Sequence, residues 1–131
     1  MRRDEMITVA VDWWANKLQN VRHDNGDPGS LLAMMMADMI AEKHIPTEEQ
    51  IDIFKRELKI RIEERLEHPV WPECRLSCDY GPCKELADAA EAAGIDNSRF
   101  PYKTHMHITE KAVSVADGYG QPLRTIALKG E

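Results

Sequence analysis

The fold depends on one stretch of sequence, Cys74-Arg75-Leu76-Ser77-Cys78-Asp79-Tyr80-Gly81-Pro82-Cys83, because the hydrophobic period changes there. Upstream, bulky side chains recur every three or four residues, which is helical spacing, whereas residues 74–80 alternate between apolar and polar like a half-buried strand. Proline at a first helical position then favours a helix from Cys83 to Ala93, with Gly94 as its left-handed terminator. This stretch therefore joins a helical half of the chain to a sheet half.

Three helices are predicted upstream, over Met6 to Leu18, Leu31 to Ile40 and Thr47 to about His68. The third has the clearest local signal in the chain, a capping box at Thr47-Glu48-Glu49-Gln50. The second has apolar residues over more than half of its circumference, so we expect it to be the buried centre of the domain. Its apolar positions are Leu31, Leu32, Met35, Met36, Met39 and Ile40.

Capping and turn-forming residues separate these helices. Asp4 is predicted to cap the first helix, and Asp27 or Ser30 the second. The run Asp24-Asn25-Gly26-Asp27-Pro28-Gly29 is predicted to form the turn between them. A calcium loop is not expected there, because the twelfth position is Met35, where the helix-loop-helix calcium pattern needs a glutamate.

The second half of the chain is predicted to form an antiparallel sheet. Tyr102 to Thr109 and Ala112 to Ala116 alternate around a tight turn, and Leu123 to Leu128 adds a further strand. Trp71, in the proline-flanked connector before the sheet, is expected to cover the edge of the core. The sequence thus predicts a single α+β domain over residues 1–131, with three N-terminal helices followed by a small antiparallel sheet of three to four strands and one inserted helix.

Composition argues against several classes of protein. The formal net charge is −6 and no dense basic face is present, so nonspecific nucleic-acid binding is not expected. No apolar run reaches the roughly 20 residues of a membrane-spanning helix, and no signal-peptide pattern follows Met1. Three cysteines, an odd count, fit a reducing cytosol. We therefore expect a cytoplasmic protein that makes no membrane contact and needs no cofactor.

The segment most suggestive of binding is the step from strand to helix at Gly81-Pro82. A helix N-terminus offers free backbone N–H groups and a positive dipole end, which together suit an anion. Two neighbouring segments add aromatic faces for stacking and one cation. The alternative is that the aromatic residues seal the end of the sheet. The predicted ligand-binding residues are Tyr80, Gly81, Cys83, Tyr102, Lys103 and Tyr119.

The cysteine and histidine residues of the second half are candidates for a catalytic or metal site. Cys74 and Cys78 lie about 13 Å apart if they share a strand, which is too far to hold one metal ion. His105 and His107 share a strand face about 6.6 Å apart, a span that two imidazoles can bridge. Cys83 lies where a helix dipole favours a thiolate. Packing cysteines and solvent-facing histidines are the simpler interpretation, so no catalytic or metal-binding residue is predicted.

Several short motifs together resemble a group of small uncharacterised proteins from phages and prophages of Firmicutes. The motifs are Asp12-Trp13-Trp14, Asn25-Gly26-Asp27, Asp79-Tyr80-Gly81-Pro82, Phe100-Pro101-Tyr102-Lys103 and Gly118-Tyr119-Gly120. They consist of tryptophans, turns and aromatic residues rather than catalytic signatures. The resemblance implies a biological context, since small phage accessory proteins often block host immunity by sequestering a nucleotide signal or clamping an immune protein.

Three functional hypotheses follow. The first is a phage-type anti-defence binding protein, a homo-oligomer, that sequesters a small anionic nucleotide-like immune signal. The second is a protein–protein inhibitor of a bacterial immune effector such as a CRISPR nuclease, acting through an acidic and aromatic surface. The third is a small hydrolase or transferase built around Cys83 or the pair His105 and His107.

Overall fold

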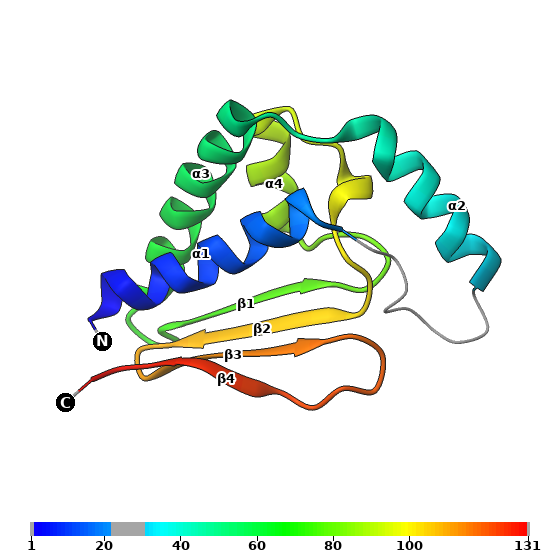
Figure 1. Cartoon of the computed structure of the whole chain (residues 1–131). Helices are drawn as coiled ribbons and strands as arrows, with labels where there is room; N and C mark the ends of the chain where they lie inside the picture. Colours follow the sequence, from blue (N-terminus) through cyan, green and yellow to red (C-terminus); the bar gives the residue numbers. More distant parts are fainter. Residues whose placement is uncertain (1, 22–30, 131) are drawn as a thin grey trace.

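A computed structural model of the chain describes residues 2–21 and 31–130 and confirms the α+β class (Figure 1). Within these residues four α-helices accompany a four-stranded antiparallel sheet. The helices are α1 (Arg3–Gln19), α2 (Leu31–Ala41), α3 (Glu48–Leu66) and α4 (Lys84–Ala93), with short 3-10 turns η2 (Glu42–His44) and η3 (Asn97–Arg99). The strands are β1 (Glu73–Cys78), β2 (Thr104–Thr109), β3 (Ala112–Asp117) and β4 (Arg124–Leu128).

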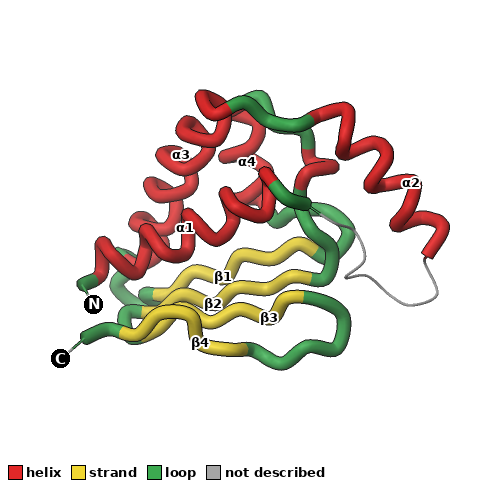
Figure 2. The backbone as a smooth tube through the Cα atoms, in the orientation of Figure 1, coloured by secondary structure: helices red, strands yellow, loops and turns green. Residues whose placement is uncertain are grey.

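The sheet has strand order β1-β2-β3-β4, so each strand pairs with its neighbour in sequence. The segment that contains α4 and η3 connects β1 to β2, which is the inserted helix that the sequence predicts. Helices α1, α3 and α4 all lie over one face of the sheet, while none of the helices among the described residues covers the other face (Figure 2). None of the helices in the described part of the chain has both the length and the apolar composition required to cross a lipid bilayer.

The core lies between these helices and the covered face of the sheet. Strand alternation places Leu76, Met106 and Val115 in register on that face, and all three are buried. Three fully buried aromatic rings fill the space above. Phe100 lies between the other two, with ring centroids 6.3 Å from Trp14 and 6.1 Å from Phe54.

Local signals at the helix ends are mostly confirmed. The amide of Gln50 donates to the Thr47 hydroxyl over 3.1 Å, and the Thr47 amide donates to the Gln50 side chain over 2.9 Å. Gly94 ends α4 with φ +72° and accepts a 2.9 Å hydrogen bond from Gln50 Nε2, which ties α3 to α4. The prediction that Asp4 caps α1 is wrong: Arg2 is the N-cap residue, the helix begins at Arg3, and Asp4 belongs to its first turn. The predicted turn at 24–29 and the caps at Asp27 and Ser30 lie outside the described residues.

Helix α2 is not the buried centre of the protein, which corrects the sequence-based expectation. Its only buried side chains are Met34 and Ala41, whereas Leu32 is 72% exposed and Met36 is 56% exposed. The reason is that α1 and α3 supply the residues that fill the core, and α2 packs mainly on the short turns η2 and η3. Figure 1 shows α2 extending away from the other helices at the end of the molecule opposite to both chain termini.

Trp71 also departs from expectation. Its side chain does not cover the core edge but is 70% exposed, because residues 69–72 turn outward between α3 and β1. Pro69 and Pro72 favour an extended connector between α3 and β1, and this connector leaves most of the indole ring in solvent.

A buried arginine connects helices that are far apart in sequence. Arg99 in η3 is 4% exposed and donates hydrogen bonds to the carbonyl oxygens of Leu18 (2.8 Å), Gln19 (3.1 Å) and Ala41 (3.0 Å). These carbonyls end α1 and α2, where the helix dipoles are negative and the carbonyls have no partner within their own helix. Burial lowers the pKa of Arg99, yet a guanidinium stays charged in proteins. One side chain thus satisfies the C-termini of two helices.

Replacing Arg99 is expected to destabilise the fold strongly. Arg99→Ala leaves three carbonyls without a partner, so we expect the free energy of unfolding to fall by about 3 kcal/mol. Arg99→Lys should recover less than half of that loss, because a compact ammonium cannot reproduce the planar fork of donors. Urea denaturation at fixed protein concentration measures both values. The exposed Arg56→Ala is the control and should change stability by less than about 0.5 kcal/mol; an equal loss in the control contradicts the assignment.

Candidate functional site

Three of the six residues predicted to bind a ligand form one cluster. The rings of Tyr80 and Tyr102 meet edge to face with centroids 4.8 Å apart, and Lys103 Nζ lies 4.7 Å from the centre of the Tyr80 ring. Tyr119 lies on the following loop, which is joined to the cluster by the hydrogen bond from the Gly118 amide to the Lys103 carbonyl, 3.0 Å long. Tyr80 and Tyr119 are about half exposed, so they do not fully seal the end of the sheet.

The cation in this cluster is already paired. Lys103 Nζ lies 2.5 Å from Asp79 Oδ1, and the Lys103 amide donates to the Asp79 carbonyl over 2.8 Å. Lys103 also has φ +53°, a left-handed conformation that costs a residue other than glycine about 1 kcal/mol or more. The backbone therefore holds Lys103 against Asp79, and an incoming anion would have to compete with that carboxylate.

Backbone and sulfur contacts join the start of α4 to the end of β1. The Cys83 amide donates to the Ser77 carbonyl over 2.8 Å, and Cys83 Sγ accepts from the Ser77 amide over 3.4 Å. Glu85, in the first turn, adds a negative charge beside these groups. Gly81 borders open space, since a Cβ added there would meet no atom within 4 Å. The anion site at this helix end stays a prediction, and the Glu85 carboxylate would compete with an incoming anion there.

The cysteines and histidines are not arranged as a catalytic pair. Burial raises the pKa of the Cys74 and Cys78 thiols to about 12, and burial also raises the pKa of the Cys83 thiol. His107 Nε2 lies 2.8 Å from Glu73 Oε2, while His105 is exposed on the uncovered face of the sheet. Among residues 2–21 and 31–130, no group of three or more potential metal ligands lies close enough to hold an ion.

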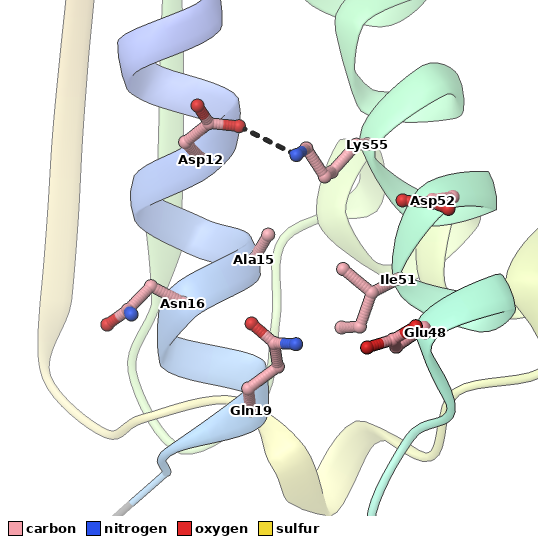
Figure 3. Close-up of a pocket in the computed structure, with 8 residues that line it drawn as sticks. All are labelled: Asp12, Ala15, Asn16, Gln19, Glu48, Ile51, Asp52 and Lys55. Carbon is pink, nitrogen blue, oxygen red and sulfur yellow. Dashed lines mark ion pairs between the residues drawn. The ribbon is translucent and has the colours of Figure 1, made fainter.

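A shallow cleft of about 380 Å³ lies between α1 and α3 (Figure 3). Its floor is Ala15 and Ile51, and Lys55 Nζ bridges the cleft to Asp12 Oδ1 at 3.0 Å. Further carboxylates and amides line the rim, namely Asn16, Gln19, Glu48 and Asp52. Because its one lysine is paired and its net charge is negative, this cleft suits neither a phosphate nor an apolar ligand.

The exposed tryptophan stands between two clefts at another end of the molecule. Trp71 is 70% exposed and its neighbour Val70 is 67% exposed. Trp71 lines both a cleft of about 260 Å³ and a second cleft of about 310 Å³. We call Val70, Trp71, Pro72 and the residues lining these clefts the Trp71 surface. The other lining residues are Arg65, His68, Glu73, Arg75, Thr109, Glu110 and Lys111.

The backbone under Trp71 is held by hydrogen bonds despite the exposure of its side chain. His68 Nδ1 accepts from the amides of Val70 (3.2 Å) and Trp71 (3.0 Å), and the Trp71 carbonyl accepts from the Glu73 amide (2.8 Å). The Glu73 side chain is in turn hydrogen-bonded to His107, and this bond lowers the pKa of the Glu73 carboxyl. The sequence signal for this site was a tryptophan between two prolines, which favour an extended, outward-turned connector.

No known protein family and no curated protein matches the chain. Function must therefore be argued from the geometry of the described residues.

The thiols are expected to be unreactive in the native protein. A pKa of about 12 for Cys74 and Cys78 reduces their thiolate fraction at pH 8 by roughly 1,000-fold compared with a free thiol. A chromogenic disulfide reagent should therefore label these two thiols only after unfolding, and Cys83 more slowly than a free thiol. A native thiol that reacts as fast as free cysteine would contradict this and revive the hydrolase hypothesis.

Proposed function

We propose that the protein is a non-enzymatic binding protein that recognises a protein partner through the Trp71 surface. One observation carries the proposal: a tryptophan side chain is 70% exposed while its own backbone amide and carbonyl are both hydrogen-bonded. A backbone that is already held reduces the conformational entropy that this residue loses on binding. Tryptophan is also among the residues that most often dominate the energy of protein interfaces.

The surroundings of Trp71 match the anatomy of a protein interface. Val70 and Pro72 extend the apolar centre, and charged residues of both signs surround it. On one side Arg65 Nη2 lies 2.7 Å from Glu85 Oε1, and on the other Arg75 Nε lies 3.5 Å from Glu73 Oε1. An apolar centre within a polar rim provides affinity at the centre and selectivity at the rim. The partner we expect has an apolar pocket that accepts an indole ring, within a rim of mixed charge.

The resemblance to small phage proteins supports a proposal for the kind of partner. We propose that the partner is a bacterial immune effector in the host cytoplasm and that binding blocks it. This choice places the protein–protein hypothesis ahead of the nucleotide-sequestering one. The reason is local: Glu85 already places a carboxylate in the first turn of α4, and Lys103 is paired with Asp79. A small anionic signal stacked on Tyr80 from outside is the alternative proposal.

A plaque assay tests the proposal. The chain is expressed in bacterial strains that each carry one defence system, and phage plaques are counted. We expect the wild-type protein to raise plaque counts at least tenfold in a responsive strain, and Trp71→Ala to abolish most of that gain. Removing an interface tryptophan typically costs 2 kcal/mol or more, which is about 30-fold in affinity, and calorimetry with the purified effector measures that loss.

Two further variants separate the alternatives. Ile60→Ala removes another exposed apolar side chain, 45% exposed on α3, and should leave plaque counts unchanged. Lys103→Ala should also leave them unchanged if the partner is a protein. Full activity of Trp71→Ala would overturn the proposal, and loss of activity in Lys103→Ala alone would instead favour the small anionic ligand.

A further inference from the structure

Helix α2 exposes a continuous apolar face to solvent. Six large side chains on it are between 50% and 72% exposed. They are Leu31, Leu32, Met35, Met36, Met39 and Ile40. At 100° per residue these positions cover about 180° of the helix, while Met34 and Ala41 lie on the opposite side toward the protein. The outward half of α2 therefore has the composition of a protein core.

An uncovered face of this kind is physically unfavourable for such a short helix. Isolated helices shorter than about 12–15 residues are marginal in water and depend on packing of their apolar face, and α2 has 11 residues. Within the described residues α2 packs chiefly on η2 and η3, near its C-terminal end, and there Arg99 holds the Ala41 carbonyl. A partner that packs on the rest of the helix would therefore stabilise it.

The size of the face is close to what a dimer requires. The exposed fractions of the six side chains amount to on the order of 600 Å², more than the few hundred Å² of a typical patch on a monomer. Pairing two such faces would bury on the order of 1,200 Å² in total, which is at the lower end of the range for stable, specific interfaces. An apolar face of this area therefore falls within the size class of specific dimer interfaces.

The order of the exposed residues fits a second copy. The six positions are symmetric about the midpoint between Met35 and Met36, so the pattern reads the same in both directions along the helix. In an antiparallel pair around a two-fold axis each contact occurs twice, and this spacing places every apolar position opposite another apolar position. In an antiparallel pair Met35 faces Met36 of the second copy, and Leu32 faces Met39 of the second copy.

The charges of α2 fit the same arrangement. Asp38 is the only charged residue in the helix; it is partly buried and lies at the edge of the apolar face, next to Leu31 on the helical circumference. The centre of the outward face therefore presents no charge that would repel its own copy. We propose that α2 packs antiparallel against α2 of a second copy, forming a two-fold homodimer. This inference is independent of the proposed function, although a dimer would present two Trp71 surfaces and so bind a multimeric partner with higher avidity.

Sedimentation equilibrium on the wild-type protein is the direct test. We expect twice the monomer mass at 50 µM and a dissociation constant at or below about 10 µM, with monomer appearing on dilution. A protein that is monomeric at 100 µM overturns the proposal. This measurement uses no variant, so it does not depend on whether a substitution is tolerated.

Charge substitutions on α2 test the register. Met35→Glu and Met36→Lys should each weaken the dimer at least 100-fold, because each buries two unpaired charges near the two-fold axis. An equimolar mixture of these two variants should dimerise again, since glutamate at 35 then faces lysine at 36 of the other chain. Failure of the mixture to dimerise, while each variant keeps its near-ultraviolet circular dichroism, overturns the antiparallel arrangement. Ile60→Glu, an exposed apolar position on α3, is the control and should leave the dimer mass unchanged.

Discussion

The structure depends on a single buried cation, Arg99, placed where two helices end. Its guanidinium satisfies the last carbonyls of α1 and the Ala41 carbonyl of α2, so a residue from the second half of the chain fixes the layout of the first. Burying a charge is unfavourable unless it is hydrogen-bonded and electrostatically compensated. Here two helix dipoles supply the compensation, and Phe100, the next residue, enters the core between Trp14 and Phe54. The same short segment therefore joins the polar and apolar parts of the fold.

The position of α2 follows from this constraint. Arg99 anchors α2 at its C-terminal end, and α1 and α3 already fill the space above the sheet. Helix α2 therefore extends away from the other helices, and most of its large apolar side chains lie outside the core. The connector between α3 and β1, which carries the Trp71 surface, lies at the other end of the molecule, the same end as both chain termini (Figure 1). The two exposed apolar regions are thus separated by the length of the helical layer and can serve two different contacts.

Helix caps and turns could be predicted from the sequence, whereas which apolar side chains are buried and which are exposed could not. The capping box at Thr47, the stop at Gly94 and the hairpin follow from short-range hydrogen bonding and backbone preference, and each is present. The periodicity of α2 shows that the helix has an apolar face, but it does not show whether this protein's own core or another chain packs against that face. The sequence predicts Cys83 at a helix start, but the hydrogen bond that its sulfur accepts from the Ser77 amide depends on β1, which lies beside it only after folding. Arg99 gave no signal at all, because a loop arginine is ordinarily exposed.

Amide hydrogen exchange along α2 tests the central claim most directly, since it reports whether this helix is ordered by its anchor alone or by a second copy as well. The account predicts that amides between Met35 and Ala41 become more protected as protein concentration rises from about 1 to 100 µM, while the amides of α1 do not change. Protection of α2 that is the same below and above the dissociation constant found by sedimentation would contradict it.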